Sequence, residues 1–353
     1  MQKRPDTLVL LTPGFAKDES DTTCLTFLQD FVTAFTHLYP MVKLSIIAFQ
    51  YPFKRGYYTW NGVRIYSAAG KSNRFPFRFI TWIRVFNKLL VIQRHSTIIA
   101  VQSFWLTECA LIGQWFRKLT GINHVSYAIG QDSKKENKYL KHLNFEQMKT
   151  VAMSETIVRN LYDATGYKAE KVIPIGIDTD KFSGGVLEKE TDVLGVGSLT
   201  PLKNYDLFVE VVRELKNYFP EIKSMIAGEG PEKELLEEKV RKINLQSSVK
   251  LLGSIAHTEV IERMKKSRIF LHTSSSEGQS TVMMEALAAG LTVVCFDVGR
   301  YPDDTKVLVC HSKEEMVMKI RELLNGNDLN SEPLVLHKMD ETVKTFAKIY
   351  DIC

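Results

Sequence analysis

The chain has 353 residues, of which 44% are hydrophobic and 25% are charged, as expected for a folded protein of two domains of ordinary size. Its five cysteines show neither the paired spacing of a zinc site nor the even number of a disulfide framework, so we expect a reducing compartment. No apolar run approaches the roughly 20 residues needed to cross a bilayer, and the N-terminal segment is too short in apolar residues for a signal peptide. These features predict a cytoplasmic protein that does not span the membrane.

Charge is distributed unevenly along the chain. Residues 1–175 contain 23 Lys and Arg against 12 Asp and Glu, whereas residues 176–353 contain 23 against 29. This asymmetry predicts that the N-terminal half meets something anionic, such as a membrane face or an anionic acceptor. The sequence shows no nucleic-acid-binding motif, so we expect no nucleic-acid partner.

Strand-like and helical runs alternate through the first half. The apolar run 7–12 indicates a buried strand, and the turn Pro13-Gly14-Phe15 leads from it to a helix over about 21–38. Further strands are expected at 43–49, 63–66, 97–101, 122–127, 150–153 and 171–174, with an aromatic loop over 51–60. This alternation is typical of a parallel sheet covered by helices on both faces, which predicts a first Rossmann-like domain.

Residues 74–95 form a basic amphipathic helix in this interpretation. Such a helix with aromatic residues can lie on an anionic membrane surface. The alternative is a helix that covers the sheet and turns its charges to water. At 100° per residue the apolar stripe consists of Phe79, Ile83, Phe86 and Leu90, and the basic residues mostly opposite are Arg74, Arg78, Arg84 and Lys88.

A turn-rich segment over 173–185 separates the two halves, and a second alternating unit follows it. Strands are expected at 192–197, 223–227, 249–252, 269–272 and 292–296. Helices are expected at 205–219, after the turn at 228–231 as far as 242, and at 258–266, 281–289, 312–324 and 341–349. This pattern predicts a second Rossmann-like domain.

Two carboxylates, Glu277 and Glu285, flank the expected start of the helix over 281–289. Gly278 loosens the backbone, Ser280 is a good N-cap residue, and Gly290 follows the helix end. Glu277 then lies in the preceding loop and Glu285 in the second turn. Backbone N–H groups at a helix start favour a phosphate, so this arrangement suits a sugar nucleotide. The alternative is an ordinary capped surface helix.

Glycine-bearing turns follow several strands of the second half, and they should converge at one sheet edge, where open parallel sheets bind ligands. Lys203 could reach this edge and neutralise a diphosphate, although a solvated lysine at a helix start is the alternative. The Gly195-Val196-Gly197 pair lacks the third glycine of a dinucleotide fingerprint, which argues against a dehydrogenase. The turns are Gly197-Ser198, Gly228-Glu229-Gly230, Gly253-Ser254 and Glu277-Gly278.

These motifs together resemble glycosyltransferase family 4. The resemblance rests on 195–199 with Lys203-Asn204, on 228–231, on Leu252-Gly253, and on Glu277-Gly278 with Glu285-Ala286 and Gly290. The resemblance is specific over 191–300 and weaker over the first half of the chain. There, residues 173–178 resemble the family's hinge, with Ile175 replacing an Asn. The resemblance implies the GT-B fold, with two α/β domains of parallel sheets facing across a cleft. The implied acceptor domain is 1–178 with a returning helix at about 338–353, and the nucleotide-sugar donor domain is 186–335.

The resemblance also implies residue roles. Glu277 would contact the donor sugar's hydroxyls and Lys203 would hold the diphosphate, as the two catalytic residues. Glu285 would bind the ribose, and Gly14 would let the first domain's backbone approach the diphosphate. The implied donor-binding residues are Gly14, Ser198, Asn204, Glu229, Gly253, Ser254, Ile255, Gly278, Gln279, Ser280, Thr281 and Glu285.

The implied reaction is transfer of a hexose from a nucleotide-diphosphate sugar with retention, without a metal or other cofactor, to a glycan, lipid-linked or small-molecule acceptor. Ser198 stands where many members have Arg, and Ile129 where many have His. Gln131 and Asp132 are the candidates that face an acceptor, with a polar loop as the alternative. His124 is interpreted as a core residue, and Asp303-Asp304 as a turn. A non-catalytic sugar-nucleotide-binding module and a sugar-nucleotide epimerase remain alternative functions.

Overall fold

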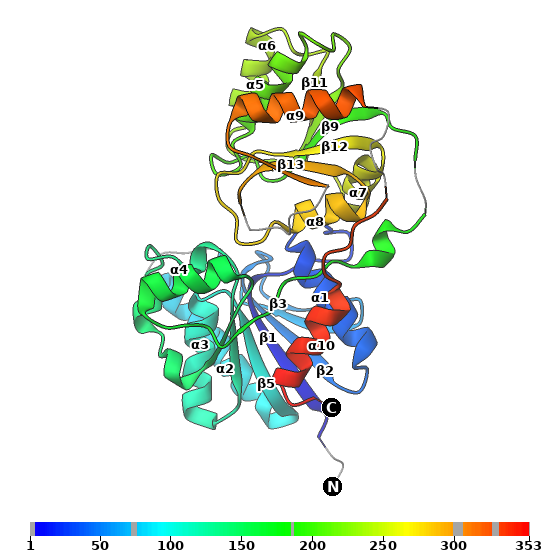
Figure 1. Cartoon of the computed structure of the whole chain (residues 1–353). Coiled ribbons are helices and arrows are strands. Elements are labelled where there is room, and N and C mark those ends of the chain that lie inside the picture. The colour runs from blue at the N-terminus through cyan, green and yellow to red at the C-terminus, as the bar shows by residue number, and fades with distance from the viewer. Residues whose placement is uncertain (1–3, 72–75, 185–186, 299–305, 327–331, 353) are drawn as a thin grey trace. The chain divides into compact units, whose positions relative to one another are not determined.

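The computed structural model describes residues 4–71, 76–184, 187–298, 306–326 and 332–352. It divides into a first unit of residues 1–176 and 337–353 and a second unit of residues 177–336 (Figure 1). The boundaries predicted from the sequence are 178, 186, 335 and 338. Each unit has its own sheet with helices on both faces, as predicted.

The first unit is built on an eight-stranded sheet with the order β3-β4-β2-β1-β5-β6-β7-β8, in which only β3 and β4 pair antiparallel. The expected loop over 51–60 is wrong in its second half, which forms β3. Asn61 and Gly62 both have positive φ and close a tight hairpin that pairs β3 with β4. The strands are β1 (Asp6–Gly14), β2 (Lys43–Tyr51), β3 (Gly56–Trp60), β4 (Val63–Ser67), β5 (Thr97–Phe104), β6 (His124–Ala128), β7 (Lys149–Ala152) and β8 (Lys171–Val172).

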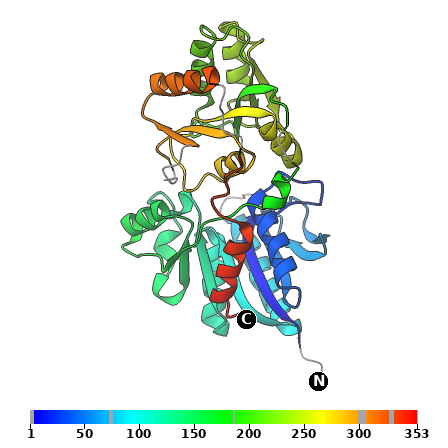
Figure 2. The same ribbon diagram turned by 45° about the vertical axis from the view of Figure 1, so that its right-hand side comes forward.

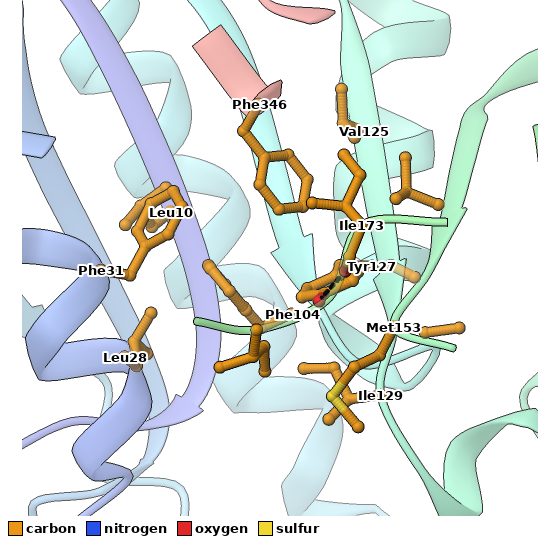
Figure 3. Packing of buried hydrophobic residues seen from close by; sticks show 14 of the residues in the cluster. Leu10, Leu28, Phe31, Phe104, Val125, Tyr127, Ile129, Met153, Ile173 and Phe346 are labelled. Carbon is orange, nitrogen blue, oxygen red and sulfur yellow. Dashed lines mark hydrogen bonds between the residues drawn. The ribbon is translucent and has the colours of Figure 1, made fainter. Parts of the chain in front are cut away.

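Two hydrophobic clusters cover the two faces of this sheet. The larger contains α1 (Thr26–Leu38), α4 (Glu155–Thr165) and α10 (Met339–Ile349), whereas α2 (Phe77–His95) and α3 (Glu108–Thr120) bury residues in the other. Helix α10 lies beside α1, and the Phe346 ring packs 5.8 Å from Phe31 and 5.0 Å from Tyr127 (Figure 3). Residues far apart in sequence therefore share one core. The Tyr127 hydroxyl is satisfied within it by donating to the Ile173 carbonyl.

Helix α2 covers the sheet, and its buried side consists of Thr81, Val85 and Leu89. The predicted apolar stripe is wrong as a single face, since Phe86 and Leu90 are partly buried against the core whereas Phe79 and Ile83 are 47% and 51% exposed. Arg74 of that prediction lies outside the described residues. Within the described ranges, no helix is both long enough and apolar enough to span a bilayer.

The second unit is built on a six-stranded parallel sheet with the order β11-β10-β9-β12-β13-β14. One face packs against α5 (Tyr205–Leu215), α6 (Lys233–Lys242) and α9 (Lys313–Asn325), and the other against α7 (His257–Lys265) and α8 (Thr281–Ala288) (Figure 2). The strands are β9 (Thr191–Val196), β10 (Ser224–Ala227), β11 (Val249–Gly253), β12 (Ser267–His272), β13 (Thr292–Phe296) and β14 (Val307–Cys310).

Candidate functional site

The strand order of the second unit reverses between β9 and β12, which are parallel neighbours. The chain leaves β9 for α5 on one face of the sheet and leaves β12 for α8 on the other. Two hydrogen bonds join the loops that diverge here, from the Ser275 amide to the Leu202 carbonyl (3.0 Å) and from the Thr273 hydroxyl to the Lys203 carbonyl (2.8 Å). A reversal of this kind is where open α/β sheets bind ligands.

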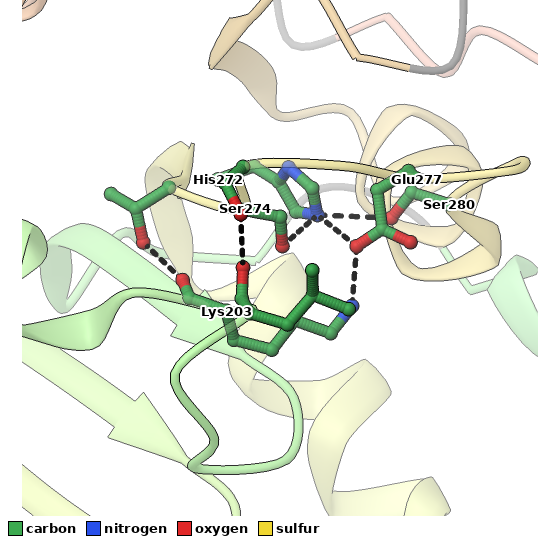
Figure 4. Close-up of polar contacts among 8 residues, drawn as sticks. Lys203, His272, Ser274, Glu277 and Ser280 are labelled. Atoms are coloured by element: carbon green, nitrogen blue, oxygen red, sulfur yellow. Dashed lines mark hydrogen bonds and ion pairs between the residues drawn. The ribbon is translucent and has the colours of Figure 1, made fainter. Parts of the chain in front are cut away.

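Lys203 and Glu277 meet at this point. The Lys203 Nζ lies 2.5 Å from Glu277 Oε1, and the two side chains are 20% and 12% exposed (Figure 4). The structure therefore brings together the cation and the carboxylate that the sequence singled out from different loops.

His272, at the end of β12, is the third member of this cluster and is not among the site residues predicted from the sequence. Its Nε2 lies 3.3 Å from Glu277 Oε1, 3.2 Å from Ser280 Oγ and 3.3 Å from Ser274 Oγ (Figure 4). The side chain is buried. A signal for it existed, because His272 is the first polar residue after the apolar run Ile269-Phe270-Leu271 of a strand that ends at the predicted site.

The surroundings of Glu277 keep its carboxyl group ionised. Burial alone would raise its pKa, but the hydrogen bond with His272 and the charge of Lys203 outweigh burial and lower the pKa to about 2. Burial lowers the pKa of His272, although the Glu277 carboxylate opposes this shift. At neutral pH the cluster thus presents a carboxylate beside a neutral imidazole, and a carboxylate is an acceptor suited to sugar hydroxyls.

Helix α8 begins at Thr281, as predicted, and Ser280 occupies its N-cap position. The expected capping role of the Ser280 side chain is wrong, since its hydroxyl makes no cap hydrogen bond and instead lies against His272. The predicted break between Glu277 and Glu285 is present, with Glu277 in the loop and Glu285 in the second turn.

Glu285 is buried and lies 2.9 Å from the Nε2 of His257, the first residue of α7. His257 is a second residue not predicted from the sequence, because only the packing of α7 beside α8 brings it to Glu285. The predicted contact of Glu285 with a ribose stays a prediction.

The glycine turns of the second unit converge at the carboxyl ends of their strands. The Gly197 amide donates to the Ala227 carbonyl, and the Gly228 amide donates to the Gly253 carbonyl at 2.9 Å. A Cβ at Gly228 would lie 1.8 Å from the Gly197 carbonyl oxygen, so only glycine permits this backbone approach.

The other predicted donor-side residues lie on the same turns. The Glu229 carboxylate is paired with Lys233, beside the backbone of Gly253. Asn204 has a left-handed backbone conformation immediately before α5. Ser198, Ser254 and Ile255 follow β9 and β11, while Gly278, Gln279 and Thr281 surround the start of α8. Their contacts with a donor stay predictions.

In the first unit, Asp132 is a buried residue of the loop after β6. It is 5% exposed, and its carboxylate accepts hydrogen bonds from the backbone amides of Leu106 (2.8 Å), Gly130 (2.6 Å) and Ile129 (3.2 Å). Burial raises its pKa against these bonds. Its side chain therefore fixes the loop after β6, whereas its neighbour Gln131 is exposed. A contact of either residue with an acceptor stays a prediction.

The remaining expectations concern single residues of the first unit and metals. His124 is buried, with its Nε2 2.8 Å from Ser103 Oγ, as a core residue should be. Gly14 ends β1, where an added Cβ would lie 3.3 Å from the Tyr51 Cβ. The described part of the chain contains no group of three His, Cys, Asp or Glu residues that could hold a metal ion. Asp303-Asp304 lie outside the described residues.

Comparison with protein families gives a match of residues 176–334 to the model described as "Glycosyl transferases group 1". The chain is 28% identical over 230 residues to a phosphatidylinositol N-acetylglucosaminyltransferase subunit of Arabidopsis thaliana, covering 61% of this chain and 52% of that protein. It is 26% identical over 270 residues to the alpha-monoglucosyldiacylglycerol synthase of Streptococcus pneumoniae, covering 67% and 60%. The chain thus spans about half the length of the first of these relatives.

Solved structures resemble the whole chain. Sucrose-phosphate synthase from Thermosynechococcus elongatus matches with a TM-score of 0.75 at 13% identity, covering 98% of this chain and 96% of that one. A glycosyltransferase from Rickettsia africae matches with a TM-score of 0.73 at 14% identity, covering 99% and 98%. At these identities the likeness concerns the fold, and it confirms the predicted fold class.

Proposed function

We propose that the chain belongs to the glycosyl transferases group 1 family, whose model matches residues 176–334, and that it is a retaining hexosyltransferase that uses a nucleotide-diphosphate sugar. The observation that carries this proposal is the Lys203–Glu277 pair where β9 and β12 diverge. An ammonium group there neutralises a leaving diphosphate, and the adjacent ionised carboxylate accepts hydrogen bonds from the sugar.

In the proposed reaction the bond between the anomeric carbon and the β-phosphate oxygen breaks, and the acceptor oxygen forms its new bond on the same face. The acceptor's proton passes to the departing phosphate oxygen. Lys203 stabilises the negative charge that develops on this oxygen, and Glu277 orients the sugar through its hydroxyls. No metal takes part in this proposal, so a chelator should leave the rate unchanged.

We propose a UDP-linked sugar as the donor, with N-acetylglucosamine as the first sugar to test. The names of several relatives support this choice, among them the 2-deoxystreptamine N-acetyl-D-glucosaminyltransferase of Niallia circulans. Structural neighbours include an O-GlcNAc transferase in complex with UDP and GlcNAc. Lipid and small-molecule acceptors fit the relatives' names, a glycan acceptor stays part of the proposal, and synthesis of a cell-surface polysaccharide or a glycolipid is the proposed setting.

Contact with an anionic membrane is part of the same proposal. Phe79, Ile80 and Ile83 are exposed on α2, and Arg78 and Arg84 lie on the same helix. Apolar and basic groups together favour the surface of an anionic bilayer. Vesicle sedimentation tests this contact. Charge reversal at Arg78 and Arg84 should abolish binding, and wild-type protein that does not bind would refute it.

The main experiment is a thermal-shift panel of UDP-, GDP- and ADP-sugars, followed by an assay for transfer and donor hydrolysis. A specific donor stabilises the folded protein in proportion to its affinity and concentration. The non-catalytic module is the second candidate, favoured by Ser198 and Ile129, and it predicts stabilisation without transfer or hydrolysis. Interconversion of donors without an acceptor would instead identify an epimerase.

A further inference from the structure

A cavity of about 680 Å³ opens in the first unit. Its walls come from the beginnings of β1, β2 and β4, the hairpin between β3 and β4, and the last turns of α2. Because parallel strands begin at one edge of their sheet and end at the other, the cavity lies at the edge opposite Gly14. It is therefore separate from the loops that the family resemblance assigns to substrates.

The titratable side chains that line this cavity are basic or neutral. Lys43, Arg64, Lys88 and His95 belong to the lining, whereas no Asp or Glu does. Across the described ranges, Lys43, Arg64 and Lys88 have no carboxylate within ion-pair distance. Most basic residues of a folded surface face water or a carboxylate, so cations collected in a concave site without a counter-charge favour an anion.

Two of these cations, Arg64 and Lys88, lie over the Tyr57 ring. The Arg64 guanidinium carbon lies 4.3 Å from the centre of the Tyr57 ring, and the Lys88 ammonium lies 4.0 Å from it. Lys88 is also 5.3 Å from the Tyr66 ring, and burial lowers the pKa of its ammonium group. The rings offset part of the cost of placing these positive charges in one cavity, and an anion would offset the rest.

We propose that this cavity is a binding site for a phosphate-bearing organic molecule. The Arg64 guanidinium can donate two parallel hydrogen bonds to phosphate oxygens, and Lys88 adds a point charge. The apolar wall formed by Pro40, Val91 and Ile92 suits an organic body attached to the phosphate. The phosphate belongs either to a lipid headgroup or to a soluble phosphate ester.

The test compares two double variants of the full chain that lose the same charge. Arg64→Gln/Lys88→Gln removes the two cations at Tyr57, whereas Lys54→Gln/Arg55→Gln removes two exposed cations outside the cavity. One arm measures sedimentation with phosphatidylcholine vesicles that contain or lack phosphatidic acid. The other measures calorimetric binding of inositol hexakisphosphate. Lys203→Gln, which alters the proposed donor site, is included in both arms.

We expect the affinity of Arg64→Gln/Lys88→Gln for the phosphate-bearing ligand to fall about tenfold or more, because the variant loses charge-assisted hydrogen bonds. The other two variants should bind like the wild type, so failure of this site is distinguishable from failure of the donor site. Binding in one arm alone identifies the source of the phosphate. Equal losses in the two double variants, or no binding by the wild type in either arm, would overturn the proposal.

Hydrogen exchange of the wild type supplies a readout that does not depend on a variant. Bound ligand should slow amide exchange in residues 61–64 and in 88–96, the segment that contributes Lys88, Val91, Ile92, His95 and Ser96 to the cavity. Unchanged exchange there, despite measurable binding, would place the ligand elsewhere and also overturn the proposal.

Discussion

The Nζ of Lys203 lies 2.5 Å from the Oε1 of Glu277, so each charge of the candidate site is neutralised by the other. A diphosphate drawn to Lys203 therefore competes with Glu277 for the ammonium group. His272, on the other side of the carboxylate, contacts the same Oε1 and can keep Glu277 in place during this exchange. We expect the pair to govern both donor binding and turnover.

Removing either member of this pair should reduce transfer strongly. Glu277→Ala or Lys203→Ala is expected to lower kcat/KM by about 100-fold or more, the effect of losing one electrostatic contact to a transition state. Lys242→Ala is the control, because it breaks an exposed ion pair with Glu238. Steady-state kinetics with circular dichroism as a folding check would measure this. Rates near the wild type in both variants would contradict the proposed mechanism.

Glu277 should also make stability depend on pH. Because its pKa falls from 4.5 in the unfolded chain to about 2 in the folded one, its contribution is complete well above pH 4.5 and is lost as the pH falls towards 2. A shift of this size corresponds to about 3 kcal/mol. Urea unfolding at a series of pH values should show that the wild type loses more stability on acidification than Glu277→Gln. Parallel curves would rule out this linkage.

The contact between two glycine turns should make Gly228 intolerant of substitution. Gly228→Ala would place a Cβ 1.8 Å from the Gly197 carbonyl oxygen, and we expect a loss of ~3 kcal/mol or more. Gly121→Ala is the matched control, because Gly121 has a positive φ with no atom within 4 Å of its added Cβ. Backbone strain alone should then cost about 1–2 kcal/mol. Equal losses in denaturant unfolding would show that the close approach is unimportant.

The Asp132 carboxylate should contribute to stability through its hydrogen bonds to backbone amides. Asp132→Asn replaces one acceptor oxygen by an NH₂ group that faces backbone amides, and we expect a loss of about 2 kcal/mol. Gln131→Ala changes the exposed neighbour and should leave stability unchanged. Thermal unfolding measures both. If Asp132→Asn is as stable as the wild type but has a raised KM for acceptor, the original interpretation of Asp132 as an acceptor-facing residue would stand.

The sequence predicts best where local periodicity and turn chemistry agree. Helix α8 was placed to within a residue at each end, because Gly278, Ser280 and Gly290 mark the break, the start and the end. The hairpin at Asn61-Gly62 was missed although Asn-Gly is a strong hairpin signal, since the aromatic and glycine residues around it favoured a loop. For α2, helical periodicity identified the helix, but which side faces the sheet depends on tertiary packing.

The candidate site likewise contains residues that local sequence identifies and contacts that only tertiary packing creates. Lys203 and Glu277 could be paired from the sequence because both follow parallel strands that end at one edge. Hydrogen bonds among buried side chains have no such signal. The pairing of His257 with Glu285 follows from the packing of two helices, and the amide contacts of Asp132 follow from how the loop after β6 folds back. Contacts of these kinds can be identified only from the three-dimensional structure.

The position of Phe346 against Phe31 and Tyr127 has a consequence for biosynthesis. During translation the ribosome releases β1 to β8 long before it releases α10. Until Phe346 emerges, the aromatic surface that it covers stays open to water and to other chains. The core of the first unit is therefore completed only after the second unit has been synthesised and can fold. We expect chaperones to bind the nascent chain during this interval.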